Sequence, residues 1–186
     1  MQVARFKYWQ LLKDLPLADL VFLDESGVNL SFVRKMARAL KGERAYGTKP
    51  ARGKNVSVIS AISIEKVLVQ QSFLGAVNGL VFEEFVASTL VPALWVGAIV
   101  IMDNCSIHKG SEVERLIKEA GATLIYLPPY SPDFSPIENA WSKLKSILRT
   151  IGARTYPDLM EALEAAFAEI TKEDLMGWFT HCCYYS

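Results

Sequence analysis

Apolar runs and alternating patterns divide the first part of the chain into strands. Residues 20–23 are all apolar and are followed by Asp-Glu-Ser-Gly at 24–27, a pattern that predicts a buried strand and then a turn. A second short strand is expected at 28–33. Residues 56–64 alternate serine with β-branched side chains, which favours a strand with one covered face, and residues 67–73 are its expected hairpin partner.

Helical spacing separates these strands from the later ones. Residues 3–13 fit a short amphipathic helix. Apolar side chains recur every three or four positions over residues 80–94, which predicts a helix packed on the sheet. Two compact apolar runs, 98–102 and 123–127, are expected to be further strands.

Capping residues and prolines mark the boundaries around these two strands. Ser111 and Glu114 have the spacing of a capping box, so a helix is expected to begin there, and Gly121 supplies its stop signal. Residues 128–132, Pro-Pro-Tyr-Ser-Pro, form a rigid loop that cannot join a sheet.

The last part of the chain has the pattern of helices alone. One apolar stripe runs over residues 136–150, and two shorter helices are expected near 157–170 and 172–180. The order of elements is therefore three mostly antiparallel strands, then strand and helix in alternation. The pattern of the core ends near residue 150.

Length and composition favour one well-buried domain, because 186 residues with 51% hydrophobic side chains are too few for two ordinary domains. No apolar run approaches the roughly 18 residues of a membrane span, and the N-terminus lacks the zones of a signal peptide. Three cysteines match neither a metal-binding spacing nor an even disulfide framework. We therefore expect a soluble, cytoplasmic protein with free thiols and no membrane partner.

The net charge is zero, but the charges are unevenly distributed. Residues 34–54 hold eight basic residues against one acid, Glu43, and the rest of the chain carries the matching negative excess. Either this segment contacts DNA phosphates or it is a solvated loop. The basic residues of the segment are Arg34, Lys35, Arg38, Lys41, Arg44, Lys49, Arg52 and Lys54, and the candidate DNA contacts among them are Arg44, Lys49, Arg52 and Lys54.

Three acids stand where a sheet-based site would present them. Asp24 and Asp103 each follow an apolar strand run, and Glu138 lies in the first turn of a predicted helix. Ligands bind beyond the carboxyl ends of strands in open α/β sheets, so the two aspartates meet there if their strands are neighbours. Converging carboxylates repel one another unless a cation joins them, and Mg²⁺ prefers such oxygen ligands. The cluster therefore indicates phosphoryl transfer.

Each acid also has a structural interpretation, and spacing alone does not decide between the two. Glu138 follows Ser135 by three residues and is also a capping-box glutamate. Asp103 could simply form an Asx-type turn. Asp24 and Glu25 are adjacent on a strand, so only one of them should face a shared site.

Three sequence segments resemble the catalytic signatures of mariner-like insertion-sequence transposases, a family of DDE transposases. The segments are Phe22-Leu23-Asp24-Glu25-Ser26-Gly27, Met102-Asp103-Asn104-Cys105-Ser106-Ile107-His108-Lys109, and the run from Leu127 through Pro136-Ile137-Glu138 to Trp141. The C-terminal Gly177-Trp178-Phe179-Thr180-His181-Cys182 resembles the bacterial branch, so the resemblance covers nearly the whole chain.

The resemblance implies an α/β, ribonuclease H-like fold with a mixed five-stranded sheet flanked by helices. It also implies that Asp24, Asp103 and Glu138 are the catalytic residues and hold two Mg²⁺ ions, with Mn²⁺ able to substitute. The implied activity is that of a DNA endonuclease and strand transferase, which hydrolyses phosphodiester bonds at insertion-sequence ends and inserts at a short target, often a TA step.

The resemblance further implies one catalytic domain over residues 1–186, with the ribonuclease H-like core at about 19–150 and a helical extension at 151–186. Family proteins carry helix-turn-helix domains before the catalytic part, and residues 1–19 contain none. We therefore expect a fragment or one product of a split reading frame. Its expected partners are DNA, both transposon ends and target, a second copy on the DNA, and a separate helix-turn-helix subunit or upstream reading frame in the bacterial cytoplasm and nucleoid.

Two other functions fit the same features. A noncatalytic transposase fragment would bind DNA or a full-length subunit and regulate transposition without cutting strands. An enzyme of the same fold that cleaves RNA is the third possibility, and a labelled RNA–DNA hybrid would expose it.

Neighbours of the acids are candidate accessory residues. Asn104 follows Asp103, and His108 is either a general base or positioning group, or a structural imidazole. Tyr130 and Trp141 either stack on an unpaired base or pack beneath the proline-rich loop.

Two cations of the predicted helix over 136–150 are candidate DNA contacts. Lys145 and Arg149 fall on roughly the same flank as Glu138, two and three turns farther on. They either bind phosphates beside the site or complement the helix dipole.

Overall fold

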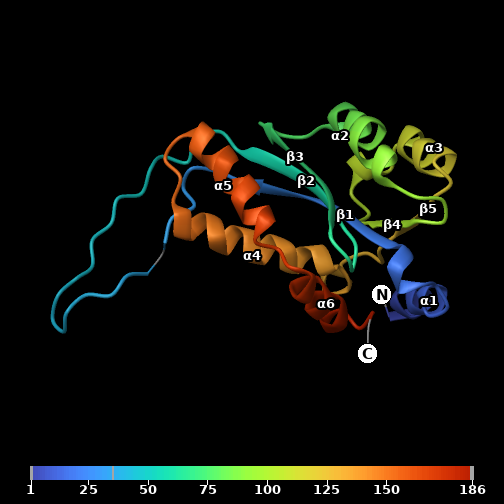
Figure 1. The fold of residues 1–186 in the computed structure, drawn as a ribbon, viewed down its shortest axis with the longest axis horizontal. Helices are drawn as coiled ribbons and strands as arrows, with labels where there is room; N and C mark the ends of the chain where they lie inside the picture. The colour runs from blue at the N-terminus through green and yellow to red at the C-terminus, as the bar shows by residue number, and fades with distance from the viewer. Residues whose placement is uncertain (1, 35, 185–186) are drawn as a thin grey trace.

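The computed structural model describes residues 2–34 and 36–184, so Lys35 of the basic segment lies outside the described residues. A central sheet lies between two groups of helices, and one long segment extends away from the body (Figure 1). None of the helices in the described part of the chain is both long and apolar enough to cross a membrane. Its three cysteines are free thiols, as expected.

The sheet is mixed and five-stranded, in the order β3-β2-β1-β4-β5. The pairs β1–β2 and β2–β3 are antiparallel, whereas β1–β4 and β4–β5 are parallel. This architecture confirms the expected fold class. The strands are β1 (Leu20–Val28), β2 (Val56–Ile62), β3 (Val67–Leu74), β4 (Ile99–Met102) and β5 (Thr123–Tyr126).

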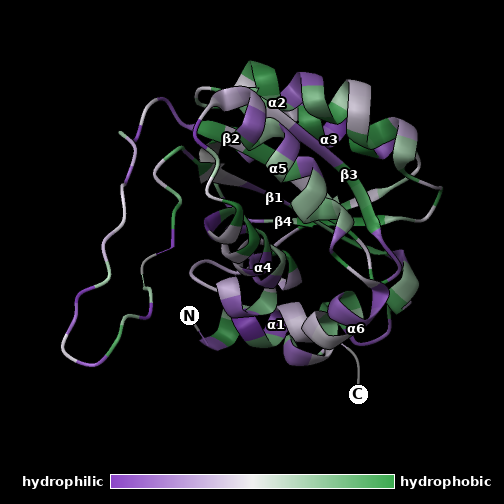
Figure 2. Ribbon diagram, turned by 60° about the vertical axis from the view of Figure 1, so that its left-hand side comes forward, coloured by the Kyte–Doolittle hydropathy of each residue, from purple (hydrophilic) through white to green (hydrophobic). Residues whose placement is uncertain are grey.

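Alternation along β1 creates two cores, one on each face of the sheet. Leu20 and Phe22 pack with the C-terminal helices, whereas Val21 and Leu23 pack with the helices on the other face. The strands between them are predominantly hydrophobic (Figure 2). One face is covered by α1 (Gln2–Leu12), α4 (Pro136–Ile151), α5 (Tyr156–Ala168) and α6 (Lys172–His181), and the other by α2 (Gly79–Phe85) and α3 (Ser111–Glu119).

The helix expected over residues 80–94 forms with mixed geometry. After α2 the chain continues through a π-helical turn, Val86–Leu90, and a 3₁₀ turn, Val91–Ala93. Pro92 supplies no backbone N–H, which favours the end of the helix there.

Two expectations about β1 are wrong. Residues 24–27 are not a turn, because β1 continues through them and pairs with β2 as far as Val28 opposite Val56. Residues 28–33 are therefore not a second strand. The chain turns away from the sheet at Asn29, whose side chain accepts hydrogen bonds from the backbone N–H of Ser31 (3.0 Å) and from its hydroxyl (2.7 Å).

Neither capping box expected from the sequence forms. Gly110 is the N-cap of α3, so Ser111 is the first helical residue rather than the cap. Ser135 does precede α4, but its side chain makes no capping hydrogen bond. Gly121, with φ of 77°, does follow the end of α3, in the left-handed conformation that glycine adopts most easily.

The segment that extends from the body is the basic arm, residues 34–54. Its described residues, 34 and 36–54, have no regular secondary structure, and the arm runs out and back beside the end of α4 (Figure 1). Its return is anchored by Arg154, which donates to the backbone oxygen of Thr48 (3.1 Å), and by Tyr156, whose hydroxyl accepts from the backbone N–H of Lys54 (2.5 Å).

Candidate active site

Strand register brings the two aspartates together. Phe22 of β1 lies opposite Ile101 of β4, and the strands are parallel. Two residues farther along each strand, Asp24 and Asp103 therefore come level at the same edge of this part of the sheet. The expectation that their strands are neighbours is confirmed.

Helix α4 supplies the third acid because it packs against β1 and begins beside this edge. Asp24, Asp103 and Glu138 all line one cavity of about 500 Å³. The proline-rich loop forms its opposite wall. The other lining residues are Leu23, Asn104, Cys105, Leu127, Pro128, Pro129, Tyr130, Ser131, Pro132 and Ser135.

Asp24 is the most perturbed of the three acids. Burial raises the pKa of its carboxyl to about 6, and the nearby charges of Glu138 and Asp103 act in the same direction. A hydrogen bond from the indole N–H of Trp141 to Oδ2 (2.9 Å) opposes the shift and fixes the carboxylate. Trp141 is buried and has this positioning contact, so it packs in the core rather than stacking on a base.

Asp103 is held by two hydrogen bonds. Its Oδ1 lies 2.6 Å from His108 Nδ1 and accepts from the backbone N–H of Cys105 at 2.8 Å, which forms the Asx-type turn. The hydrogen bond with His108 is the main reason that the pKa of Asp103 is lowered. The turn and the position in the cavity are therefore compatible, and Asp103 has both.

His108 is a buried imidazole that packs against the ring of Phe82, with ring centroids 4.5 Å apart and the two planes tilted by 34°. Among the described residues, neither its Nε2 nor the buried Oε2 of Glu25 has a hydrogen-bond partner. Burial raises the pKa of Glu25, and the charge of His108 lowers it. The charge of His108 therefore affects Glu25 as well as Asp103, although its side-chain hydrogen bond is with Asp103.

Glu138 is exposed and is not engaged in a cap. The first turn of α4 is closed instead by the backbone N–H of Glu138, which donates to the backbone oxygen of Ser135 at 3.1 Å. Because Ser135 makes no side-chain cap, the capping-box interpretation of Glu138 is wrong. The carboxylate is free to act in the cavity.

Two residues of the cavity wall differ in their roles. Asn104 donates its side-chain N–H to the backbone oxygen of Leu127 and so ties the ends of β4 and β5 together. Tyr130 is 86% exposed, so it does not pack beneath the proline-rich loop. Its φ of 55° turns the loop at the cavity mouth.

Contacts from the N-terminal helix hold the proline-rich loop, and sequence patterns gave no signal for them. Arg5 donates to Ser131 Oγ and to Asp133 Oδ1, both at 3.0 Å, and stacks over the ring of Phe134 at 3.9 Å. Tyr184 donates to the backbone oxygen of Phe134 at 2.7 Å. The loop that leads into α4 is therefore held from both ends of the chain.

Three carboxylates that line one cavity are a donor set whose chemistry suits divalent cations such as Mg²⁺. Within residues 2–34 and 36–184, no three acidic, imidazole or thiol groups are placed closely enough to enclose one ion. A closed cage is not required for Mg²⁺, which takes one or two carboxylates and completes its shell with water and phosphate oxygens. Burial is the main cause of the raised pKa of Asp24, and a cation would relieve the smaller contribution that the charges of Glu138 and Asp103 make in the same direction.

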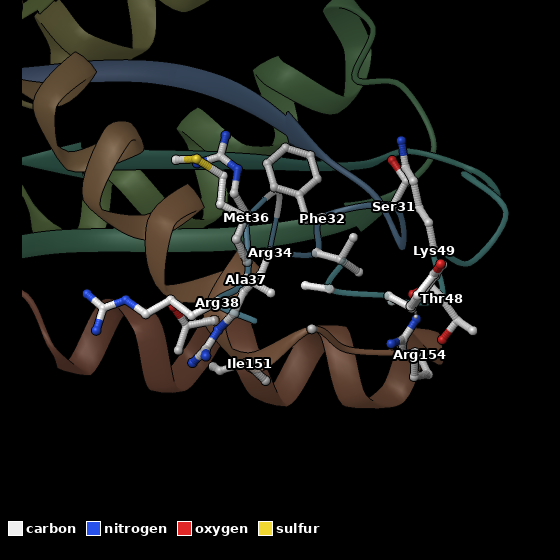
Figure 3. Close-up of a pocket in the computed structure, with 17 residues that line it drawn as sticks. Ser31, Phe32, Arg34, Met36, Ala37, Arg38, Thr48, Lys49, Ile151 and Arg154 are labelled. Atoms are coloured by element: carbon white, nitrogen blue, oxygen red, sulfur yellow. Dashed lines mark hydrogen bonds between the residues drawn. The ribbon is translucent and has the colours of Figure 1, made fainter. Parts of the chain in front are cut away.

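The predicted DNA-contacting residues lie on α4 and on the basic arm. Lys145 and Arg149 extend along α4 on the flank of Glu138, as the helical spacing predicts. Lys49 and Arg149 line a second cavity at the base of the basic arm (Figure 3). Arg44, Arg52 and Lys54 lie on the arm, and neither they nor any other described arm residue lines the acidic cavity.

Comparison with known proteins gives one family match. The family model described as DDE superfamily endonuclease matches residues 19–161. A curated relative, the transposable element Tcb1 transposase of Caenorhabditis briggsae, is 26% identical over 124 residues, which cover 63% of this chain and 45% of the relative. The chain therefore spans less than half the length of that relative.

Solved structures show the same fold. The Mos1 transposase paired-end complex with the left transposon end superposes with a TM-score of 0.78 at 19% identity, over 97% of this chain and 57% of that one. The catalytic domain of Mos1 mariner transposase superposes with a TM-score of 0.70 at 12% identity, over 97% and 85% of the two chains. These likenesses confirm the ribonuclease H-like fold.

Proposed function

Because the chain belongs to the DDE superfamily endonuclease family, we propose that it is the catalytic domain of a transposase that cuts and joins DNA. The observation that carries this proposal is the convergence on one cavity of Asp24 from β1, Asp103 from the turn directly after β4, and Glu138 from α4. Carboxylates placed in this way serve metal-assisted phosphoryl transfer.

The proposed cofactor is a pair of divalent ions, Mg²⁺ or Mn²⁺, held by these three carboxylates. Related Mos1 complexes have been solved with Mn and with Mg, which supports the use of such ions. When bound, the pair would activate a water or a DNA 3′-hydroxyl and stabilise the leaving oxygen.

The protein's own contribution is to hold the carboxylates in place. Trp141 fixes Asp24 through its indole N–H, and His108 fixes Asp103 through Nδ1. Glu138 projects from the first turn of a helix that is packed on β1. Because Asp24 and Asp103 are held by hydrogen bonds and Glu138 is carried by a packed helix, little reorganisation is needed when charge develops on the reacting oxygens.

DNA is the proposed substrate. Support comes from the relatives: one is a transposase of a transposable element, and the Mos1 complex contains a transposon end. We propose that the chain acts as a homodimer on DNA and that a helix-turn-helix part, in a separate subunit or upstream reading frame, recognises the ends.

The test is metal-dependent strand cleavage. Supercoiled plasmid is incubated with the protein and Mg²⁺ or Mn²⁺, and nicked and linear products are measured for the wild type and for Asp103→Asn. Lys118→Ala, on the exposed side of α3, is the control. We expect cleavage by the wild type and the control, and its loss in Asp103→Asn. Full activity of Asp103→Asn would refute the assignment, and DNA binding without cleavage under either metal would identify the noncatalytic fragment instead.

A further inference from the structure

A second, larger cavity lies between the base of the basic arm and the C-terminal end of α4. Its volume is about 1210 Å³. One wall comes from residues 31–34, 36–38 and 45–49 of the chain, and the other from residues 149–152 with Arg154 (Figure 3). We call this cavity the basic groove.

Cations line the basic groove without any compensating acid. The charged residues among its described lining are all basic, with no Asp or Glu among them. They are Arg34, Arg38, Lys49, Arg149 and Arg154. Their total charge suits a polyanion rather than a single phosphate, because five positive charges are spread along a long concave surface.

These cations also lack ion pairs. Arg115 and Lys143, elsewhere on the molecule, form salt bridges with carboxylates. Among the described residues, no cation of the basic groove does so. Arg154 donates to the backbone oxygen of Thr48, and Arg149 lies over the ring of Phe32 at 5.2 Å, so two of the five are held in place while keeping their charge.

Helix α4 connects the basic groove to the acidic cavity. Glu138 stands in its first turn and Arg149 in its last, eleven positions apart, which is close to three whole turns. Both therefore lie on one flank, with Lys145 between them. At about 1.5 Å per residue their separation along the helix is about 16 Å, or roughly five base pairs of B-DNA at about 3.4 Å each.

We propose that the basic groove binds the phosphodiester backbone of the same DNA duplex that enters the acidic cavity, about five base pairs from the reacting phosphate. This proposal rests on the proposed function, because it takes DNA as the substrate. The groove fixes the position of the duplex along α4 and does not take part in the chemistry.

A second copy of this chain is a weaker candidate for the occupant of the basic groove. Met36 and Tyr46, which belong to its lining, are each 89% exposed, and exposed apolar side chains can mark a protein interface. In a symmetric dimer in which this surface meets itself, an identical basic arm would, however, bring the same positive charges against those of the groove. Phosphates neutralise these charges, whereas another arm would add to them.

Arg38 and Lys49 offer the cleanest test, because the structure gives neither side chain a hydrogen bond or an ion pair within its described residues. The double variant Arg38→Ala/Lys49→Ala removes two positive charges from an exposed segment, so the fold should be unaffected. The matched control, Lys66→Ala/Lys118→Ala, removes two charges from exposed positions outside the groove.

Binding to a fluorescent duplex of about 20 base pairs is measured by anisotropy in EDTA over a range of salt concentrations, which keeps it independent of cleavage. If both side chains contact phosphates, the slope of log affinity against log salt should fall by about 1.8 in magnitude, and affinity at about 0.1 M salt should fall about 60-fold. The control should bind as the wild type does. In plasmid cleavage, KM should rise with kcat nearly unchanged.

An unchanged salt slope in the double variant would overturn the groove proposal, even if the wild type cleaves DNA normally. The same holds if the variant keeps its DNA affinity but shifts from dimer to monomer in sedimentation, since that result would assign the groove to a second copy. Failure of the proposed function is a separate result, seen as wild-type binding without cleavage.

Discussion

Replacing Asp24 by asparagine should stabilise the protein in the absence of metal. Asp24 is a carboxylate on β1 whose burial raises its pKa from 3.8 to about 6. Its Oδ2 accepts a hydrogen bond from Trp141, and an asparagine oxygen can accept the same bond. Asp24→Asn therefore keeps the contact and removes the charge.

The size and the sign of this stability difference follow from the pKa of Asp24. A raised carboxyl pKa means that the folded protein holds the proton more tightly than the unfolded chain does, so this contribution to stability is present below about pH 4 and is lost as pH rises through about 6. A shift of about two units corresponds to about 3 kcal/mol. The free energy of unfolding of Asp24→Asn should therefore exceed that of the wild type by up to about 3 kcal/mol near pH 8, with little of this pH-dependent difference left near pH 4.

Urea unfolding in EDTA, followed by circular dichroism across this pH range for both proteins, measures the difference directly. Other titrating groups are common to both chains and cancel. A stability difference that stays constant with pH, or that grows toward acid pH, would contradict the conclusion that burial destabilises the charged form of Asp24. In the wild type, saturating Mg²⁺ should recover part of the lost stability at pH 8, and it should do so far less in Asp24→Asn.

Two further predictions concern Trp141, which contacts Asp24, and Gly53 at the base of the basic arm. Trp141→Phe removes the hydrogen-bond donor to Asp24 and should lower the free energy of unfolding by at least about 2 kcal/mol at pH 8 in urea unfolding. The loss should be smaller at pH 5, where the Asp24 carboxyl is protonated. An equal loss at both pH values would mean that Trp141 stabilises the fold through packing alone. Gly53→Ala should destabilise more than Gly42→Ala in urea unfolding, because both have positive φ but only at Gly53 would a Cβ meet the hydroxyl of Tyr156, at 2.5 Å; equal losses would contradict this contact.

Most of the fold was predictable because apolar periodicity reports burial. The strands at 56–64, 67–73, 98–102 and 123–127 and the helices after residue 135 were located within a few residues of their bounds. The two cores of the sheet also follow from simple alternation along its strands. Pattern and packing agree in these elements, so local sequence was sufficient.

The errors in the fold have a common cause. The extent of β1 depends on its pairing with β2, a partner about thirty residues away in sequence, and polar residues 24–27 give no local sign of it. The capping boxes failed because side-chain spacing permits a cap without requiring it. Tertiary contacts decide between such local alternatives.

The candidate site was also predictable only in part. The sequence indicated all three acids, and strand register accounts for the meeting of Asp24 with Asp103. It did not reveal that Trp141 positions Asp24 or that Arg5 holds the proline-rich loop, because these contacts join residues more than a hundred positions apart. Metal binding by the three acids remains a prediction.

That prediction is tested most directly by Mn²⁺ titration calorimetry in the presence of duplex DNA. The wild type is compared with Asp24→Asn, Asp103→Asn and Glu138→Gln, and Lys118→Ala is the control. We expect the wild type and the control to bind Mn²⁺, and each acidic-site variant to bind at least about tenfold more weakly while remaining folded. Equal Mn²⁺ affinity in the wild type and all three variants would contradict a shared metal centre at these carboxylates.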